Sequence, residues 1–282
     1  MFLICKKRKL NDSMTLMEID APYIAKKAKA GQFIILRVNE RGERIPLTIA
    51  DYDREKGTVT IIYQVVGKTT LLLDTLNEGD GIEDFTGPLG KASELDGYKR
   101  AAVVGGGAGC AIAYPQAKAL HARGAKVDVI AGFRNAGLTI LENEMRAVSD
   151  RLTVMTDDGS NGNKGFVTDA LKKNIEEGAG YDLVVAIGPL MMMRAVCRLT
   201  KEYGIKTIIS MNPIMIDGTG MCGGCRLTVG GRTKFACVDG PDFDGHEVDF
   251  DEAIRRSRTY SEMEREEARD FRCKLMGGAE HA

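Results

Sequence analysis

The pattern of hydrophobic and polar positions changes at two points along the chain. Residues 1–97 carry short β-branched and apolar runs, such as Phe33–Val38 and Thr58–Val66, separated by Gly and Asp clusters at short intervals. Such runs are typical of the strands of a small antiparallel barrel. One helical stretch, near residues 71–76, interrupts them. We therefore expect an N-terminal antiparallel β-barrel.

In residues 98–210 strand-like apolar runs alternate with helical stretches. The runs are Ala101–Val104, Lys126–Ile130, Leu152–Met155, Asp182–Ile187 and Lys206–Ser210. Strands that alternate with helices predict βαβ units and hence a parallel sheet. Residues 211–282 follow as a Cys- and Gly-rich loop and a charged helical tail.

Composition excludes several classes of protein. The 282 residues carry a net charge of −1 with both signs interspersed, which argues against a surface for nucleic acid or anionic membranes. No apolar run approaches the roughly 18 residues that span a bilayer. The first residues place charge after a very short apolar run, the reverse of a signal peptide. We expect a soluble, cytoplasmic protein that binds neither nucleic acid nor membranes.

The cysteines indicate a metal site. Three of the seven, Cys222, Cys225 and Cys237, lie close together after Asp217 in the pattern D-x4-C-x2-C…C. An odd count with a C-x2-C core favours metal over disulfides. With Cys in place of Asp217 the spacing is that of plant-type [2Fe–2S] ferredoxins, and the glycines let the backbone curl around a cluster.

Two alternatives stay open for this loop. Asp217 could cap a turn while water or another Cys completes the site, and a C-x2-C core also binds zinc. The remaining cysteines are expected to be buried apolar residues or idle thiols: Cys5, Cys110, Cys197 and Cys273.

Glycines follow the first strand of the second segment. The turn Gly106-Gly107-Ala108-Gly109 would let N–H groups approach a pyrophosphate at a helix N-terminus. Cys110 replaces the last glycine of a G-x-G-x-x-G pattern, so a tight turn without a ligand is the alternative.

Further candidates follow the later strands. Phe133, Arg134 and Asn135 end the second strand, where the ribose of an adenosine would lie. Arg134 could contact a ribose or a 2′-phosphate, so the choice between NAD and NADP stays open. Asp157 and the pair Gly188-Pro189 also follow strands, at the edge where such sheets bind ligands.

The order of these motifs resembles the ferredoxin–NADP reductase superfamily, in the branch that holds the electron-transfer subunit of dihydroorotate dehydrogenase. Within that branch the chain is most similar to the small (alpha) subunits of NADH-dependent reduced ferredoxin:NADP oxidoreductases, also named sulfide dehydrogenase beta subunits. The resemblance covers essentially the whole chain. It rests on Arg44–Thr48, Gly67–Thr70, Gly87–Gly90, Gly105–Gly109, Gly132–Asn135 and the loop from Asp217 to Pro241.

The resemblance implies a β + α/β fold: an N-terminal antiparallel β-barrel for FAD (1–97), a parallel-sheet nucleotide-binding domain for NAD(H) (98–210), and a C-terminal [2Fe–2S] loop and helical tail (211–282). It also implies the FAD-binding residues, which are Arg44, Pro46, Leu47, Thr48, Ile62, Tyr63, Gln64, Thr69 and Thr70. Thr69 stands where relatives often carry Gly. Asp217 departs from the four cysteines of the dihydroorotate branch and is shared with the bifurcating subunits.

The implied function is electron transfer. The chain would be an oxidoreductase subunit that moves electrons between NAD(H) and a larger flavin and iron–sulfur partner, similar to the glutamate synthase small subunit, through which ferredoxin takes part. No catalytic acid or base is expected, because hydride transfer needs none. The tail could dock on that partner or pack on its own chain. Two other functions stay open: electron transfer in an NAD-dependent dihydroorotate dehydrogenase, and a non-catalytic redox sensor or scaffold.

Overall fold

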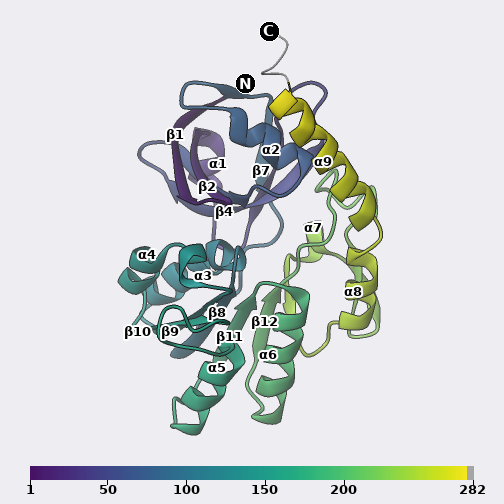
Figure 1. The fold of residues 1–282 in the computed structure, drawn as a ribbon. Coiled ribbons are helices and arrows are strands. Elements are labelled where there is room, and N and C mark those ends of the chain that lie inside the picture. Colours follow the sequence, from purple (N-terminus) through teal and green to yellow (C-terminus); the bar gives the residue numbers. More distant parts are fainter. Residues whose placement is uncertain (278–282) are drawn as a thin grey trace.

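The computed structural model describes residues 1–277, and its first part is a nearly closed antiparallel sheet (Figure 1). The strands pair in the order β6-β1-β2-β5-β4-β3-β7. The two edge strands, β6 and β7, are consecutive in sequence, so the sheet curls into a barrel. The strands are β1 (Phe2–Asn11), β2 (Met14–Asp20), β3 (Phe33–Arg37), β4 (Arg44–Asp53), β5 (Thr58–Gln64), β6 (Gly81–Ile82) and β7 (Asp84–Leu89). Two helices, α1 (Pro22–Lys27) and α2 (Lys68–Thr75), interrupt them.

Apolar side chains at alternate positions of the strands fill the interior of the barrel. Met17 and Ile19 of β2 lie opposite Ile61 and Val59 of β5, and all four side chains are fully buried. Successive residues of a strand point to opposite faces, so the residues between them point out of the barrel. Leu73 of α2 is also buried in this core, which is why the predicted helix forms there.

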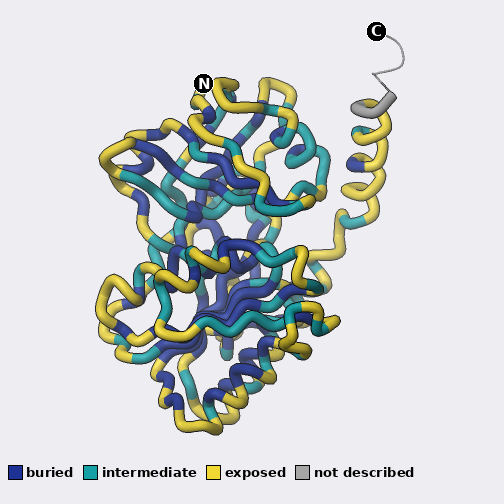
Figure 2. Tube along the Cα trace, turned by 60° about the vertical axis from the view of Figure 1, so that its left-hand side comes forward, coloured by how far each residue is buried: buried dark blue, intermediate teal, exposed yellow. Residues whose placement is uncertain are grey.

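The second part is a sheet with the order β10-β9-β8-β11-β12-β15. Its first five strands are parallel, as the sequence predicts, and β15 is antiparallel to β12. Figure 2 shows these strands as the most continuously buried part of the chain. The strands are β8 (Arg100–Gly106), β9 (Lys126–Phe133), β10 (Arg151–Thr156), β11 (Leu183–Ile187), β12 (Thr207–Ser210) and β15 (Asp242–Asp244).

Helices cover both faces of this sheet. α3 and α4 contribute buried residues to one core, and α5 and α6 to the other. Burial on both faces explains why the parallel strands are nearly uninterrupted apolar runs. The helices are α3 (Gly109–Ala122), α4 (Glu142–Ala147), α5 (Val167–Glu176) and α6 (Leu190–Glu202), with a short 3₁₀ turn, η1 (Ala136–Leu138).

The remainder of the chain packs on these two parts. It forms a hairpin of β13 (Arg226–Val229) and β14 (Arg232–Phe235), then α7 (Ala236–Asp239), β15, α8 (Phe250–Ser257) and α9 (Ser261–Gly277). Phe250 and Ala253 of α8 are buried in a core that also contains Cys225. α9 runs beside the barrel (Figure 1), where Glu267 pairs with Lys68 of α2 at 2.9 Å. Through residue 277 the helical tail therefore packs on its own chain, and residues 278–282 of that tail lie outside the described residues.

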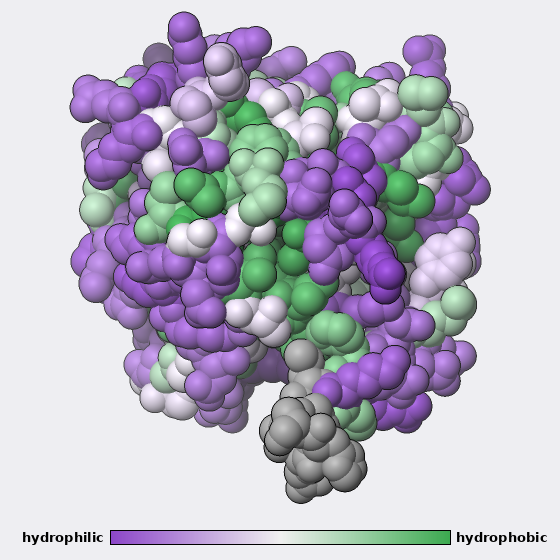
Figure 3. All heavy atoms as spheres, turned by 90° about the horizontal axis from the view of Figure 1, so that it is seen from above, coloured by the Kyte–Doolittle hydropathy of each residue, from purple (hydrophilic) through white to green (hydrophobic). Residues whose placement is uncertain are grey.

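The molecular surface is mixed in character. Seen from above, one face is mostly hydrophilic, with a band of hydrophobic residues near its middle (Figure 3). None of the helices within residues 1–277 combines the length and the apolarity needed to cross a membrane.

Asp242 of β15 joins all three parts of the chain and generates a prediction about stability. Its Oδ2 atom accepts hydrogen bonds from Ser93 Oγ (2.5 Å), which follows the barrel, and from Gln116 Nε2 (3.1 Å) of α3. Burial raises the pKa of Asp242 from near 3.8 to about 6. The folded state thus holds this proton more tightly than the unfolded state, and the resulting stability is lost as the pH rises through about 6.

We expect Asp242→Asn to remove this loss. The free energy of unfolding of the variant, measured relative to that of the parent, should rise by roughly 2 kcal/mol between pH 4 and pH 7.5, since one pKa unit corresponds to about 1.4 kcal/mol. Thermal denaturation at both pH values measures the difference. The exposed Glu247 of the same segment provides the control Glu247→Gln. An equal pH dependence in the parent and Asp242→Asn would contradict the assignment.

Candidate functional site

A cavity of about 890 Å³ lies between the barrel and the carboxyl edge of the parallel sheet. Asn11, Ser13, Met14 and Gln64 line it from the barrel. The turns after β8 and β11 line it from the sheet. β8 and β11 are the neighbours at which the strand order reverses, and α/β sheets bind ligands at such a switch point.

Close backbone approach explains the glycines of the two turns. A Cβ atom on Gly109 would lie 2.4 Å from the carbonyl oxygen of Ile187, and one on Gly188 would lie 3.1 Å from Gly106 N. Gly107 differs, because it has a φ of 54° and open space on its Cβ side. Gly109 and Gly188 are therefore needed for packing, and Gly107 leaves space beside the N-terminus of α3.

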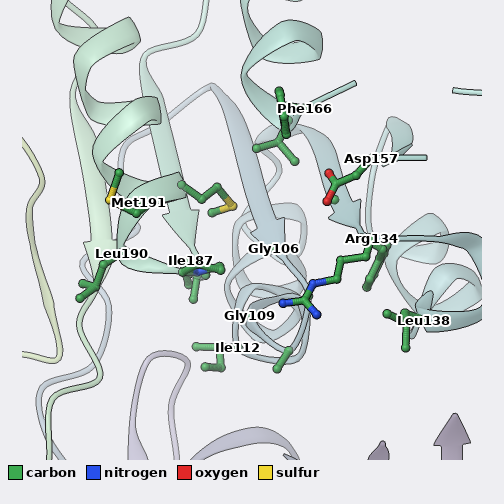
Figure 4. Close-up of a pocket in the computed structure, with 18 of the residues that line it drawn as sticks. Gly106, Gly109, Ile112, Arg134, Leu138, Asp157, Phe166, Ile187, Leu190 and Met191 are labelled. Carbon is green, nitrogen blue, oxygen red and sulfur yellow. The ribbon is translucent and has the colours of Figure 1, made fainter. Parts of the chain in front are cut away.

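Two charged side chains enter the cavity from the second and third strands. Arg134 follows β9 and Asp157 follows β10, and both side chains point toward the glycine turn (Figure 4). Asp157 N donates to Phe133 O at 3.0 Å, which fixes the spacing of the two strand ends. Among the ion pairs of residues 1–277, none joins Arg134 to Asp157. Both groups are thus available to a ligand.

Most of the predicted nucleotide-binding residues meet in this cavity. Its walls include Gly106, Gly107, Ala108, Gly109, Phe133, Arg134, Asp157, Gly188 and Pro189, but not Asn135. Residues that the sequence did not single out also line it: Phe166 and Val167 where α5 begins, Leu190 to Met192 on α6, and Ser210, Asn212 and Ser257. Phe166 is 65% exposed, and this exposure of a large apolar residue is visible only in the fold.

The candidate flavin residues of β5 point to two different faces. Gln64 lines the cavity and Ile62 is partly buried against the core of the second sheet. Tyr63 points inward, is 2% exposed and donates from its hydroxyl to Asp74 Oδ1 at 3.4 Å. Burial raises the pKa of Tyr63 far above its ordinary range. Its ring therefore belongs to the barrel core, and only its backbone is available to a ligand.

Thr69 and Thr70 lie at the N-terminus of α2. Thr70 Oγ1 accepts from the backbone N of Gly67 at 3.0 Å, and Thr69 Oγ1 donates to Glu43 Oε2 at 3.0 Å. The Thr70 hydroxyl thus closes the first turn of the helix. The nearby backbone N–H groups, at the positive end of the helix dipole, favour an anion.

Arg44 links the barrel to the cysteine-containing loop. Its Nε donates to Ile216 O at 3.0 Å, immediately before Asp217. Pro46, Leu47 and Thr48, which follow on β4, are half-buried. The strand that carries the candidate flavin residues therefore contacts the candidate metal loop directly.

Asp217 is held as a carboxylate. Its oxygens accept from the backbone N of Thr219 (3.1 Å) and of Cys222 (2.9 Å), and from Cys222 Sγ (3.5 Å). Desolvation is the largest single contribution and raises the pKa of Asp217, but the hydrogen bonds together outweigh it and lower the pKa to about 2. The group is ionised at neutral pH, as a metal ligand must be.

Cys225 and Cys237 form a second pair. Their sulfur atoms are 3.2 Å apart, and both residues are buried. The β13–β14 hairpin between them turns at Gly230-Gly231, where both φ values are positive. Burial and the neighbouring Cys225 raise the pKa of Cys237 to about 12.

The four candidate ligands therefore fall into two pairs, Asp217 with Cys222 and Cys225 with Cys237. Within residues 1–277, no group of three His, Cys, Asp or Glu side chains surrounds a single metal position. Backbone N–H groups point at two of the sulfurs, from Gly224 to Cys222 and from Cys237 to Cys225, each at 3.5 Å. Three sulfur donors and a carboxylate in pairs fit a two-iron cluster, which has four protein ligands.

The close approach of the glycine turns generates a prediction. Gly109→Ala would place a methyl group against Ile187 O and push α3 away from β11. We expect this variant to lose about 1–3 kcal/mol of stability, as overpacking does, and to bind NADH at least about tenfold more weakly because the turns separate. Calorimetric titration and thermal denaturation check both effects.

Gly137→Ala is the matched control, because its Cβ would meet only Asn135 Oδ1, at 3.4 Å. Wild-type NADH affinity in Gly109→Ala would contradict this account of the turn.

Residues 212–249 match the model of the iron–sulfur cluster binding domain of dihydroorotate dehydrogenase B. A solved structure of the NADH-dependent reduced ferredoxin–NADP oxidoreductase, described for flavin-based electron bifurcation, contains a similar chain. The two are 45% identical with a TM-score of 0.90, over 95% of this chain and 97% of that one. The Amycolatopsis cytochrome P450 reductase, 24% identical with a TM-score of 0.60 over 71% of this chain and 65% of that one, shares the fold.

Relatives with known names agree with this match. The homologue of the dihydroorotate dehydrogenase B (NAD⁺) electron-transfer subunit from Thermotoga maritima is 47% identical over 93% of this chain and 92% of its own length. The electron-transfer subunit from Clostridium acetobutylicum is 34% identical over 85% of this chain and 93% of its own length. The resemblance inferred from the motifs is thus confirmed. The chain belongs to the family of the dihydroorotate dehydrogenase B electron-transfer subunits and their homologues.

Proposed function

We propose that this chain is an FAD- and [2Fe–2S]-containing subunit that moves electrons between NAD(H) and a larger partner flavoprotein. One observation carries the proposal. Gln64 of β5 lines the cavity at the switch point, while Arg44 of the neighbouring strand, β4, binds the carbonyl next to Asp217. The candidate nucleotide, flavin and cluster sites are therefore adjacent.

The cavity residues would bind and orient the dinucleotide. The N–H groups at the start of α3, beside Gly107, would hold the pyrophosphate. Arg134 and Asp157 would contact the adenosine, since they follow the second and third strands. Gly188 and Pro189 would place the nicotinamide toward the barrel. On this assignment residues 98–210 are the NAD(H) domain.

The barrel, residues 1–97, would hold FAD. Arg44 and Thr48 on β4 provide a cation and a hydroxyl, and the first turn of α2 with Thr69 and Thr70 provides backbone donors for a diphosphate. Ile62, Gln64, Pro46 and Leu47 would contact the ring system from the outer faces of β4 and β5. Tyr63 would contribute its backbone alone, because its ring is buried in the barrel core.

Residues 211–282 would supply the cluster. Asp217 and Cys222 would hold one iron, and Cys225 and Cys237 the other, an assignment supported by the contact within each pair. The paired arrangement favours two irons over one zinc ion, which would need its ligands around a single point. When bound, the cofactors would supply hydride acceptance and one-electron transfer, and the protein would orient them.

The loop also has an exposed side suited to a partner. Ile216, Met221 and Val238 are 53%, 88% and 40% exposed next to the ligands, and Cys222 is exposed as well. Clustered exposed apolar residues mark protein interfaces. We assign this side to a larger flavin and iron–sulfur subunit of the glutamate synthase small-subunit type, through which ferredoxin and NADP(H) take part in electron bifurcation.

A second candidate function is electron transfer in a dihydroorotate dehydrogenase. The relatives named for that enzyme favour it, at 32–36% identity. The chain from the bifurcating enzyme is 45% identical, which is more than these subunits but slightly less than the 47% of the Thermotoga maritima homologue of the same subunit. Co-purification with a dihydroorotate-oxidising subunit would select the second candidate.

The first test is a spectrum of the anaerobically purified chain with iron analysis, before and after NADH. We expect about two irons per chain, as a [2Fe–2S] cluster requires, and flavin bands that bleach on adding NADH. The Cys225→Ser variant should lose iron while NADH still bleaches its flavin, which would show that the two cofactors bind at separate sites. A preparation that contains zinc, or that ignores NADH after FAD is supplied, would overturn the proposal.

The second test separates ligation by Asp217 from capping. Asp217→Asn keeps an oxygen that can accept hydrogen bonds from Thr219 N and Cys222 N, but an amide is a poor iron ligand. We therefore expect the iron content of this variant to fall well below that of the parent. Asp217→Cys restores a fourth thiolate and should keep about two irons with a changed EPR spectrum. Cys273→Ser, at an exposed thiol, is the control. Full iron and an unchanged spectrum in Asp217→Asn would show that Asp217 only caps the turn.

A further inference from the structure

Three arginine side chains hold backbone carbonyls of the cluster loop. Arg226 Nη1 donates to Gly223 O at 3.1 Å, and Arg256 Nη2 donates to Gly224 O at 3.2 Å. Arg44 Nε donates to Ile216 O on the other side of the loop. Among the ion pairs of residues 1–277, none includes these three arginines. Asp84 lies near enough to Arg44 for the arginine charge to lower the pKa of Asp84, whereas no ion pair within the described residues engages Arg226 or Arg256.

Arg256 differs from the other two because it comes from the C-terminal tail. Its helix, α8, begins with an Asp249 cap, whose Oδ1 accepts from Glu252 N at 2.9 Å. Glu252 Oε2 in turn accepts from Thr228 N of the hairpin at 3.0 Å. Together with the buried Phe250 and Ala253, these bonds fix α8 against the loop. Arg256 is half-buried there, whereas its neighbour Arg255 is exposed.

The carbonyl that Arg256 holds belongs to a residue in contact with a ligand. Gly224 accepts from Arg256 through its oxygen and donates through its nitrogen to Cys222 Sγ at 3.5 Å. Hydrogen bonds to cluster sulfurs and nearby charge are the means by which proteins set cluster potentials. Arg256 thus both orients a sulfur-bonding residue and places a cation beside the loop.

Charge counting gives the direction of the effect. Two ferric ions, two sulfides, three thiolates and one carboxylate sum to −2, and reduction by one electron makes the cluster −3. A fixed cation beside the loop stabilises the more negative state. We propose that Arg256 is a positioning residue that raises the reduction potential of the [2Fe–2S] cluster, an inference that rests on the cluster of the proposed function.

The experiment compares Arg256→Gln, Arg256→Lys and the control Arg255→Gln in the full chain. Each is purified anaerobically, its iron is counted, and its cluster is titrated with EPR detection. We expect Arg256→Gln to retain iron and to shift the one-electron equilibrium about tenfold toward the oxidised cluster. This shift corresponds to a reduction potential about 59 mV more negative than that of the parent. Arg256→Lys, which keeps the charge, should lie near the parent, and Arg255→Gln should match it.

The possible outcomes are distinguishable. Absence of a cluster in the parent would refute the proposed function itself. A full cluster in Arg256→Gln with the parent's potential would overturn only this inference, as would an equal shift in Arg255→Gln. If Arg256→Gln loses iron, Arg256→Lys becomes the test: a parental potential supports the inference, and a shifted potential or loss of iron there overturns it.

Discussion

The pairing of β15 with β12 is the contact on which the arrangement of the sites depends. Asp242 lies opposite Ser210, and the backbone N of Met211 donates to Pro241 O at 2.9 Å. Lys91 N, which follows the barrel, donates to Gly240 O at 2.6 Å. Because β15 begins five residues after Cys237, this short strand fixes the buried cysteine pair relative to both the nucleotide sheet and the barrel.

Elements that depend on local pattern could be predicted from the sequence. The five parallel strands are continuous apolar runs because helices cover both of their faces, so each is visible on its own. The glycine turn after β8 is also predictable, because its glycines are consecutive in the sequence and follow an apolar run. The metal loop was recognised from spacing alone, because its ligands lie close together in the chain.

Elements that depend on distant contacts could not be predicted. β15 has three residues, two of them aspartates, and becomes a strand only because β12 offers a free edge. The orientation of Tyr63 depends on the register of β5 against β2, since a shift of one residue would turn the ring outward. Ser257 reaches the cavity from a tail almost fifty residues beyond β12, and no local signal marks it.

The two pairs of candidate ligands differ in how they respond to protons. Asp217 is half-buried and, with a pKa of about 2, is ionised at any physiological pH. Cys225 and Cys237 are buried, and the pKa of Cys237 is raised to about 12. Since iron binds the thiolate, loading must release protons from the buried pair. The candidate ligand Asp217 therefore lies on the less buried side of the loop with Cys222, where hydrogen bonds keep the carboxylate ionised, and Cys225 and Cys237 lie where water is excluded.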